Sequence, residues 1–303
     1  MRIVRPIGLV LLLLLVAITT ACDGGRSERL FTYDDDAPLS IQVADSWQNG
    51  NQQVISISYA SPLGGRVPAL IVVPPGHGPF AGLIVQHGLP GDRFAMLQVA
   101  EDFARLGAVV VAIDAPWARA KRLITFTKRD RTEQIQLITD LRRAVDLLRS
   151  RDDVDDDRIG YLGVSYGAAM GGLLAGVEDR IAAFVLNVGD GGLVTHFTGA
   201  EDAQGPLSQL PAARLESWLA AMEPIEPLKW IGKAEAPILL QSGRDDDLVP
   251  PADAKEFHRA APETKEVRWY DAWHLLPNEA WCDAARWLQE TIAVSGNKHP
   301  ACG

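Results

Sequence analysis

The stretch that decides the fold runs from Ile159 to Ala175 and reads Ile-Gly-Tyr-Leu-Gly-Val-Ser-Tyr-Gly-Ala-Ala-Met-Gly-Gly-Leu-Leu-Ala. Its first six residues form a short apolar run, which is typical of a buried strand. The residues after Ser165 are small and apolar, which suits a helix packed closely on a sheet. Ser165 therefore stands at a strand-to-helix turn, at the centre of the pattern G-x-S-x-G.

This serine is the candidate nucleophile of the chain. A sharp turn lifts its Oγ out of the sheet, and the flanking Gly163 and Gly167 avoid side chains that would collide with neighbouring backbone. A serine hydroxyl is too weak an acid to attack a carbonyl unaided at neutral pH. It needs a general base, and the base needs a carboxylate that orients it.

The sequence around this turn alternates strand and helix patterns. Alternation of this kind predicts an α/β fold with a mostly parallel central sheet of about eight strands and helices on both faces. The expected strands are 54–59 (a half-exposed edge strand), 67–73, 81–86, 108–113, 159–164, 181–188, 237–241 and 267–270. The expected helices are 96–106, 132–149 with Thr132 as N-cap, 166–177, 252–260 and 278–294.

Residues 189–235 interrupt the alternation. They are rich in glycine and proline, with one helical stretch at 212–222. An insertion of this length inside a compact domain is usually functional, so we expect a small cap over the site. A surface excursion without function is the alternative.

The general base is chosen from six histidines. In an arrangement where base and acid both follow the serine along the chain, each after a later strand, only His274 has a fitting position, because it comes directly after the last strand and before the final helix. The other five histidines do not fit. His87 lies before the serine and His77 in a Pro/Gly loop. His196 lies in the cap, His258 in a helix and His299 in the tail.

The orienting acid is expected just after the strand 237–241, where Asp245, Asp246 and Asp247 compete. Asp246 is our choice, with Asp247 next and Asp190, after the preceding strand, third. The oxyanion of the transition state needs two backbone N–H donors, one of them on the residue after the nucleophile, Tyr166. The loop His87-Gly-Leu-Pro-Gly91 is the expected source of the other, and Leu89 is the candidate because Pro90 has no N–H.

These motifs resemble the α/β-hydrolase superfamily from about residue 53 to residue 290. The 163–167 motif, the loop 87–91 and the spacing Gly243, Asp246, Val249, Pro250 carry the resemblance. The runs 140–148 and 154–160 are similar to the branch that contains dienelactone hydrolases, acetyl xylan esterases and prolyl oligopeptidases. Two features depart from it: dienelactone hydrolases use a cysteine nucleophile, and prolyl oligopeptidases carry a β-propeller before the catalytic domain.

The resulting hypothesis is a serine hydrolase that cleaves carboxylic esters of small molecules. A serine peptidase of the same fold and an inactive hydrolase-fold envelope protein are the alternatives. Trp117, Phe197 and Trp218 are candidate pocket residues, with core packing as the other interpretation. The sequence shows no His/Cys cluster with metal-ligand spacing, so no metal or other cofactor is expected. A net charge of −10 without a basic stripe disfavours nucleic acid as a partner, and the oligomeric state is left open.

The first 21 residues have the features of a secretory signal peptide, with Arg2 and Arg5 before an apolar run of about 12 residues. That run is short for a membrane span, which needs roughly 20 residues. Cys22 follows Ala21 in a segment that resembles a bacterial lipoprotein signal, which implies lipidation of Cys22 and an anchor at the membrane. Ordinary cleavage that leaves Cys22 unmodified is the alternative. We therefore expect export to the periplasm or cell envelope.

The remaining division of the chain follows from composition. Residues 22–50 are polar and are expected to be a tether and lead-in segment, residues 51–295 the hydrolase domain, and residues 296–303 a tail. Cys282 and Cys302 are two thiols that export would allow to form a disulfide. The sequence alone leaves open whether they are bridged or free.

Overall fold

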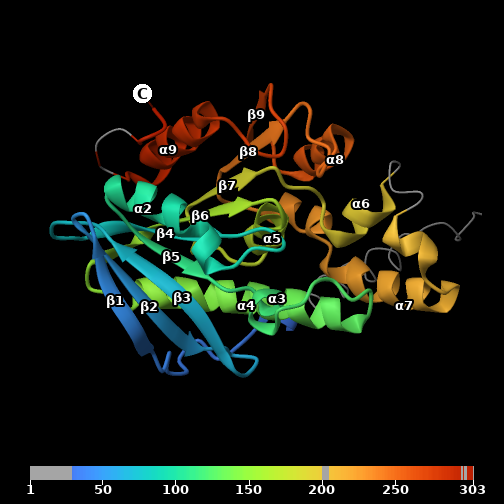
Figure 1. Ribbon diagram of the computed structural model, residues 1–303, viewed down its shortest axis with the longest axis horizontal. Coiled ribbons are helices and arrows are strands. Elements are labelled where there is room, and N and C mark those ends of the chain that lie inside the picture. Colours follow the sequence, from blue (N-terminus) through green and yellow to red (C-terminus); the bar gives the residue numbers. More distant parts are fainter. Residues whose placement is uncertain (1–28, 200–204, 295, 297–298, 303) are drawn as a thin grey trace, which may run out of the picture.

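The computed structural model describes residues 29–199, 205–294, 296 and 299–302. It has the expected α/β architecture, with one nine-stranded sheet in the order β1-β2-β3-β5-β4-β6-β7-β8-β9 (Figure 1). In this order, the neighbours β1–β2, β2–β3 and β3–β5 pair antiparallel. Every later pair, from β5–β4 to β8–β9, is parallel. The strands are β1 (Gln42–Asn49), β2 (Gln52–Ala60), β3 (Arg66–Val73), β4 (Phe80–Gln86), β5 (Ala108–Ile113), β6 (Val154–Val164), β7 (Ala183–Asn187), β8 (Ile238–Gly243) and β9 (Glu266–Tyr270).

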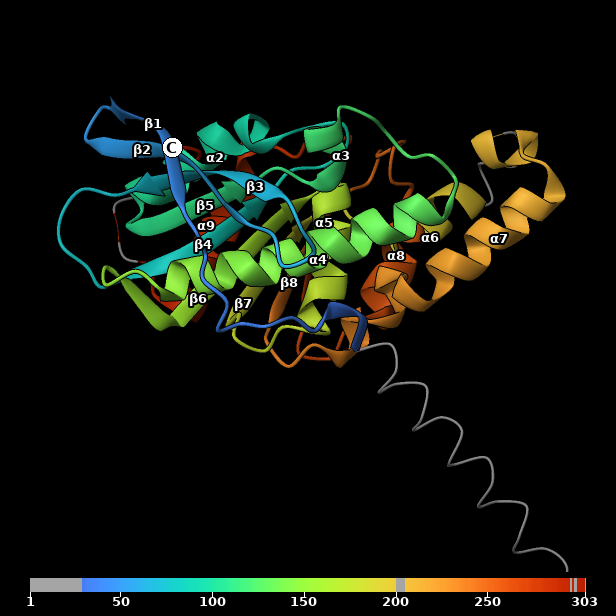
Figure 2. The ribbon, with the colours of Figure 1, turned by 90° about the horizontal axis from the view of Figure 1, so that it is seen from below.

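Helices cover both faces of this sheet. Figures 1 and 2 show α2 and α9 on one face and the long α4, with α5, on the other. The α-helices are α2 (Leu97–Arg105), α3 (Pro116–Ala120), α4 (Lys128–Arg149), α5 (Tyr166–Ala175), α6 (Leu193–Thr198), α7 (Ala212–Met222), α8 (Pro251–Ala260) and α9 (Asn278–Ile292). Short 3₁₀ turns lie between them, among them η2 (Arg93–Met96) before α2.

The two faces of the sheet form two separate hydrophobic cores. In β5, Val109 and Val111 pack with α4 and α5, whereas Val110 and Ala112 pack with α2 and α9. Successive side chains of a strand point to opposite faces, so a strand that is covered on both sides must be apolar at every position. This explains why the central strands appear in the sequence as unbroken apolar runs.

The sequence prediction was wrong about the beginning of the fold. Residues 22–50 were expected to be a tether, but Gln42–Asn49 forms strand β1, which pairs with β2. The strand expected at the edge, 54–59, therefore lies one place inside it. β1 has no buried face, and only Trp47 is partly covered, so no apolar alternation marks it as a strand. Phe31 is also part of the core, with its ring 5.5 Å from that of Trp230.

The start of α4 also differs from the prediction. The helix begins at Lys128, four residues before the expected position, and its N-cap is Thr127 instead of Thr132. The Thr127 Oγ1 accepts from the Arg129 N–H, and Asp130 accepts in return from the Thr127 N–H, which together make a capping box. Thr132 lies inside the helix, where its hydroxyl donates to the Lys128 carbonyl.

The insertion between β7 and β8 contains α6, α7 and several 3₁₀ turns. The expected helix at 212–222 coincides with α7, which lies beside the N-terminal end of α4 (Figure 2). Arg214 of α7 donates to the carbonyl oxygens of Thr125 and Phe126, and Trp218 donates to Asp130 at 2.9 Å. The insertion is thus packed onto the hydrolase core near the carboxyl edge of the sheet.

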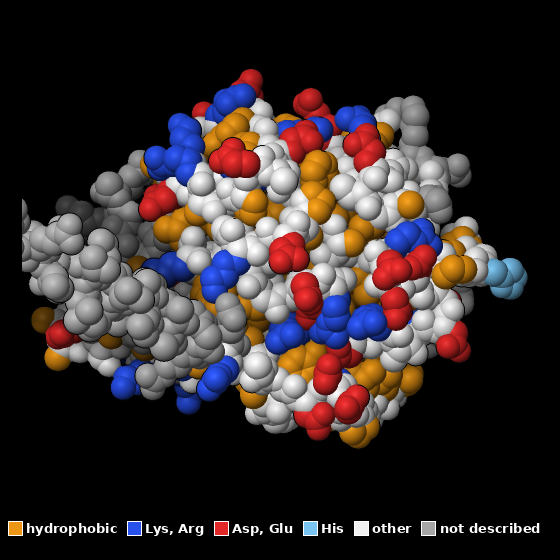
Figure 3. Space-filling model, turned by 180° about the vertical axis from the view of Figure 1, so that it is seen from behind, with side chains coloured by type: hydrophobic (Ala, Val, Ile, Leu, Met, Phe, Trp, Pro, Cys, Tyr) orange, Lys and Arg blue, Asp and Glu red, His pale blue; other side chains and the backbone are white. Residues whose placement is uncertain are grey.

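The C-terminal segment is joined to α9. Cys282 and Cys302 form a disulfide with their Cα atoms 5.1 Å apart, and His299 is buried against Phe103 with ring centroids 5.2 Å apart. The face drawn in Figure 3 carries acidic and basic side chains next to one another. Among the helices of the described residues, none has the length and apolar character needed to cross a membrane. The expected signal peptide 1–21 and the lipidation site Cys22 lie outside the described residues.

Candidate active site

Ser165 stands at the turn between β6 and α5 in a backbone conformation that an L-residue rarely adopts. Its φ is 56° and its ψ is −122°, and its N–H donates to the Asn187 carbonyl at 2.8 Å. The flanking glycines are required by close contacts. A Cβ on Gly163 would lie 2.3 Å from the carbonyl oxygen of Gly167, and a Cβ on Gly167 would lie 2.4 Å from that of Gln86. A strained residue in such a position is a common feature of functional sites.

His274 and Asp246 meet at the same edge of the sheet. The Nδ1 of His274 lies 2.9 Å from Oδ2 and 3.1 Å from Oδ1 of Asp246. The carboxylate also accepts from the N–H groups of Leu248 and Val249 at 3.0 and 2.9 Å. Because an ionised carboxylate only accepts, Nδ1 must carry the imidazole proton, which leaves Nε2 as the basic nitrogen.

The three consecutive aspartates after β8 differ sharply in their surroundings. Asp246 is 3% exposed, whereas Asp245 and Asp247 are exposed. Asp247 accepts instead from the indole N–H of Trp273. Of the competing carboxylates, the structure therefore brings Asp246 to His274.

The two candidate oxyanion donors flank Ser165. Tyr166 is the first residue of α5, where backbone N–H groups have no partner within the helix. The loop with Leu89 passes directly over the serine, since a Cβ on Gly88 would lie 2.8 Å from the Cβ of Ser165. Both Leu89 and Tyr166 line the same cavity as Ser165 and His274. This arrangement can direct N–H groups at an oxygen bound next to the serine.

His87 holds the oxyanion loop in place. Its Nε2 accepts from the Ala115 N–H at 3.2 Å, so its Nδ1 carries the proton and donates to the Gly88 carbonyl at 2.8 Å. Burial lowers the pKa of His87, which keeps the ring neutral and this tautomer fixed. Both ring nitrogens of His87 are engaged, so this residue braces the loop and is not available as a general base.

A cavity of about 560 Å³ opens in front of Ser165. Phe197 of α6 lines it, as expected, but the other two predicted pocket residues do not. Trp117 is buried behind Tyr166, with ring centroids 4.9 Å apart, and Trp218 is fully buried under α4. These two large side chains cover core surface near the insertion, and sequence position alone does not separate the two roles.

This cavity also contains a second carboxylate–imidazole pair, which the sequence did not predict as a pair. Asp190 follows β7, and its Oδ2 lies 2.9 Å from Nδ1 of His196, while its Oδ1 accepts from the Gly192 N–H at 2.9 Å. Both side chains line the cavity. Val188 has a φ of 49°, a strained conformation for a β-branched residue, just before this loop. The six-residue spacing from Asp190 to His196 after a buried strand was the only signal in the sequence.

Glu226 lies behind this pair and is almost completely buried. Its Oε1 accepts from the N–H groups of Val194 and Thr195 at 3.0 and 3.1 Å. Burial, reinforced by the negative charge of Asp190, raises the pKa of Glu226 to about 8, although hydrogen bonds from Thr195 and Val194 oppose the shift. The carboxyl group is therefore largely neutral at pH 7.

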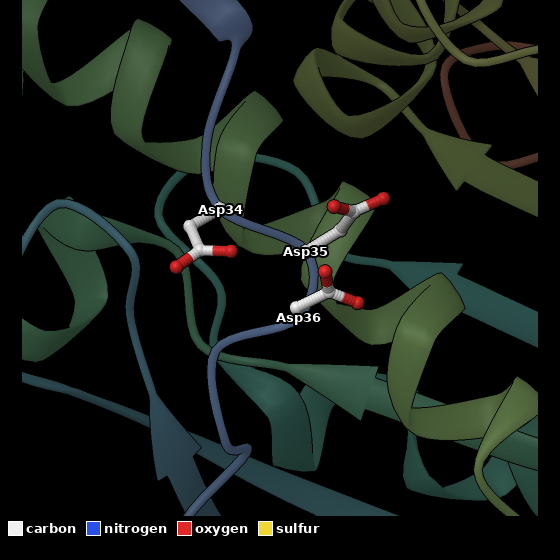
Figure 4. Close-up of side chains that lie close together, drawn as sticks. All are labelled: Asp34, Asp35 and Asp36. Carbon is white, nitrogen blue, oxygen red and sulfur yellow. The ribbon is translucent and has the colours of Figure 1, made fainter.

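Three exposed carboxylates gather at Asp34, Asp35 and Asp36, before β1 (Figure 4). Their oxygens lie within 4.8 Å of one another, and none of these residues lines the cavity in front of Ser165. Exposed acidic side chains in water are well solvated without a metal. The cluster has no part in the candidate site.

Fold and site together define a hydrolase of the α/β type. Residues 102–273 match the prolyl oligopeptidase family, and the chain belongs to that family. An uncharacterized protein of Mycobacterium tuberculosis is 30% identical over 228 residues, which are 73% of each chain. The α/β hydrolase domain-containing protein WAV2 of Arabidopsis thaliana is 28% identical over 136 residues, 41% of this chain and 42% of that protein.

Solved structures share the fold. An acetyl xylan esterase from Paenibacillus sp. R4 superimposes with a TM-score of 0.74 at 20% identity and covers 88% of this chain and 93% of its own. The esterase Pf2001 from Pyrococcus furiosus gives a TM-score of 0.59 at 18% identity, over 86% and 98% of the two chains. The predicted α/β-hydrolase fold is thereby confirmed.

Proposed function

We propose that the protein hydrolyses carboxylic esters through an acyl-serine intermediate. The observation that carries this proposal is the hydrogen bond from His274 to Asp246, because the His274 ring lines the same cavity as Ser165. A histidine fixed in this tautomer presents Nε2 as a base toward the cavity, which is what a serine nucleophile requires.

In the first half of the reaction, Ser165 Oγ bonds to the ester carbonyl carbon, and its proton passes to Nε2 of His274. Asp246 stabilises the positively charged imidazole that results. The carbonyl oxygen takes up the negative charge and accepts from the N–H groups of Leu89 and Tyr166. The carbon–oxygen bond to the alcohol then breaks, and the alcohol leaves with the proton from His274.

In the second half, water repeats these steps on the acyl-serine. His274 takes a proton from a water molecule while the water oxygen bonds to the acyl carbon. His274 then passes this proton to Ser165 Oγ as the bond between Oγ and the acyl carbon breaks and the acid is released. No other reactant is needed. The fold neighbours named as esterases support the choice of an ester as substrate.

A serine peptidase is the second candidate, because the family match is to prolyl oligopeptidases. The two functions separate in one experiment on purified protein. We expect release of p-nitrophenol from p-nitrophenyl butyrate, little or no release of p-nitroaniline from aminoacyl p-nitroanilides, and loss of the ester activity in Ser165→Ala. Preferential cleavage of the anilides would favour the peptidase, and undiminished ester hydrolysis by Ser165→Ala would refute the mechanism.

We also propose that the protein is exported and anchored through a lipid at Cys22. The disulfide between Cys282 and Cys302 supports export, because such bonds persist in oxidising compartments. Cell fractionation should find the full-length protein with the membranes and a Cys22→Ser variant in the soluble envelope fraction. Membrane association of the Cys22→Ser variant equal to that of the native protein would contradict the lipid anchor.

A further inference from the structure

Exposed apolar side chains gather around the entrance of the cavity in front of Ser165. Nine large apolar side chains are exposed among the described residues, and five of them belong to this group. These five, the apolar rim, are Phe94, Leu123, Leu248, Trp273 and Leu275. Single apolar side chains on a protein surface are common, whereas a group of them at one place marks an interaction site. The apolar rim therefore indicates a surface that meets a partner.

Each member of the apolar rim lies at the cavity or next to a residue that lines it. Leu123 and Leu248 line the cavity themselves, and Trp273 and Leu275 are the chain neighbours of the lining residue His274. The fifth member, in η2, directly precedes a further lining residue. The other four exposed apolar side chains neither line the cavity nor neighbour a lining residue in the chain; they are Ile41, Val43, Leu63 and Val267. The apolar rim is thus continuous with the entrance to the site.

The apolar rim is built from segments that follow β4, β5, β8 and β9. Parallel strands place their carboxyl ends at one edge of the sheet, so these segments lie on both sides of β6 and of Ser165. Inside the rim, hydrocarbon and thioether side chains line the cavity on both sides as well. They include Leu89, Met96, Ile124, Leu193, Phe197 and Val249. A long hydrocarbon chain that enters past the rim therefore stays in contact with apolar side chains.

Trp273 has the surroundings of an aromatic side chain at a lipid–water boundary. Its indole N–H donates to the exposed carboxylate of Asp247, and the residue is 46% exposed. Tryptophan is enriched at membrane interfaces, where its polar end stays wet and its apolar body is buried. Leu275, two positions later, is 77% exposed and can leave water only against a partner.

Charged side chains of both signs stand beside the apolar rim. The residues before Leu123 are the exposed cations Lys121 and Arg122, whereas the residue before Leu248 is the exposed carboxylate Asp247. A surface of mixed charge has no strong preference for anionic head groups, which attract clusters of basic residues. The partner that fits the rim is therefore a lipid surface with neutral or zwitterionic head groups.

The position of the N-terminal attachment also favours a lipid surface. Arg29, the first described residue, comes seven positions after Cys22, the proposed lipidation site. Seven residues span at most about 25 Å when fully extended. A lipid at Cys22 would therefore hold the domain beside the membrane, where the apolar rim meets lipid.

We propose that the apolar rim docks on a neutral or zwitterionic lipid surface, and that the substrates are long-chain esters held in that surface. The proposal rests on the ester hydrolysis proposed above and names its substrate class. On docking, the rim side chains exchange water for lipid, and the acyl chain of the ester passes from the lipid into the cavity without crossing water. The bonds made and broken at Ser165 are those already described.

Flotation with phosphatidylcholine vesicles measures docking without catalysis. The protein carries Cys22→Ser and Ser165→Ala, so that neither a lipid anchor nor turnover affects the result. It should float with the vesicles. Adding Phe94→Ser and Leu275→Ser should lower the partition coefficient at least about tenfold, because complete burial of one leucine side chain contributes about tenfold or more.

The matched control replaces two exposed apolar side chains outside the apolar rim. Val43, in β1, is 66% exposed, and Leu63, in the turn between β2 and β3, is 50% exposed. Val43→Ser with Leu63→Ser should leave the partition coefficient within about twofold, and vesicles that contain anionic phosphatidylglycerol should bind no more than about threefold better. No flotation, an equal loss in the control, or binding to the anionic vesicles alone would overturn the proposal.

Hydrolysis from vesicles tests the substrate class, with Cys22→Ser protein in which Ser165 is intact. The rate on p-nitrophenyl palmitate in phosphatidylcholine vesicles is compared with the rate on p-nitrophenyl acetate in solution. The ratio of palmitate to acetate rates should fall at least about tenfold when Phe94→Ser and Leu275→Ser are introduced, and it should stay unchanged in the control. Phe94→Ser alone should lower the ratio about threefold and serves if the pair does not fold.

Two results of the vesicle assay would overturn the proposal. They are hydrolysis of the acetate without the palmitate, and a ratio that the rim variants leave unchanged. Absence of any Ser165-dependent hydrolysis of either ester would instead overturn the proposed function. Flotation needs no turnover and would still decide whether the apolar rim docks.

Discussion

Two carboxylate–imidazole pairs reach the same cavity through their imidazole rings, and their hydrogen bonds have the same length. In each, the imidazole Nδ1 is 2.9 Å from a carboxylate oxygen, Asp246 for His274 and Asp190 for His196. They differ in setting. The first pair joins residues 28 positions apart, and the side chains of Asp246 and His274 are 1% and 12% exposed. The second pair joins residues six positions apart, and the side chains of Asp190 and His196 are 7% and 36% exposed.

The difference in setting suits the first pair to orienting a catalytic base and the second pair to binding a ligand. Asp246 accepts from two backbone N–H groups besides His274, so its carboxylate is fixed and can orient a base. Asp190 accepts from one, at Gly192, and its imidazole partner is more open to solvent. A fixed, dry pair suits a step in which charge develops on the imidazole, and an open pair suits binding of a group that arrives from water.

The largest effect expected is on catalysis through the first pair. Asp246→Asn should lower kcat for p-nitrophenyl butyrate by about 10³- to 10⁴-fold, because an amide can hold the wrong imidazole tautomer. Steady-state kinetics measures the loss, with circular dichroism to verify folding and the exposed neighbour substitution Asp245→Asn as the control. A larger loss in Asp190→Asn than in Asp246→Asn would reverse the roles of the two pairs.

Glu226, behind the second pair, gives the next effect, on stability. Its pKa is raised to about 8 in the fold, against 4.5 as the ordinary value, so between these pH values the unfolded chain binds fewer protons. The native protein should therefore lose stability as pH rises from about 5 to 8. Glu226→Gln should remove this loss and be more stable at pH 8 by a few kcal/mol, since one pKa unit corresponds to about 1.4 kcal/mol.

Urea unfolding at pH 5 and pH 8 measures this dependence. Glu223→Gln is the matched control, because the Glu223 side chain is 65% exposed and substituting it should leave the native pH dependence in place. Parallel pH profiles for the native protein and Glu226→Gln would show that the buried carboxyl is not held neutral. The second pair would then lie next to a further negative charge.

The disulfide should stabilise the fold without affecting either carboxylate–imidazole pair. Replacing Cys282 and Cys302 together by serine opens a loop of 20 residues, which should cost about 3 kcal/mol in the free energy of unfolding. We expect a lower Tm by calorimetry and a kcat within about twofold of the native value at 25 °C. A Tm equal to that of the oxidised native protein, or a kcat lost at 25 °C, would contradict this separation.

The smallest effect expected is on catalysis through the second pair. With p-nitrophenyl butyrate, Asp190→Asn should lower kcat/KM by less than about tenfold, because the pair touches no reacting atom. The same assay as for Asp246→Asn measures it. A fall in kcat of a hundredfold or more would place Asp190 in the chemistry.

Most of the candidate catalytic site, Ser165 with the pair Asp246–His274, could be predicted from the sequence. Ser165 is marked by glycines that the turn requires, and His274 is singled out by its position after the last strand. The spacing to Gly243, Val249 and Pro250 favours Asp246 among three aspartates, and burial distinguishes it in the structure. The central strands were found because burial on both faces leaves unbroken apolar runs.

The remaining features depend on contacts that a sequence does not carry. β1 has no apolar face, so its partner β2 alone defines it. Trp117 and Trp218 differ from Phe197 only in whether their rings turn toward the core or the cavity. The loop that pairs Asp190 with His196 begins after a strained turn at Val188, a conformation that a β-branched residue rarely adopts and that the sequence does not predict.

The most direct test of the central claim is covalent labelling of Ser165. A fluorophosphonate reacts with a serine only when a neighbouring base activates the hydroxyl, so native protein treated with this reagent, digested and mapped by mass spectrometry should carry the label on Ser165. Asp246→Asn should label far more slowly and Asp190→Asn at close to the native rate. Native, folded protein that takes no label at Ser165, or that is labelled at another serine, would contradict the account.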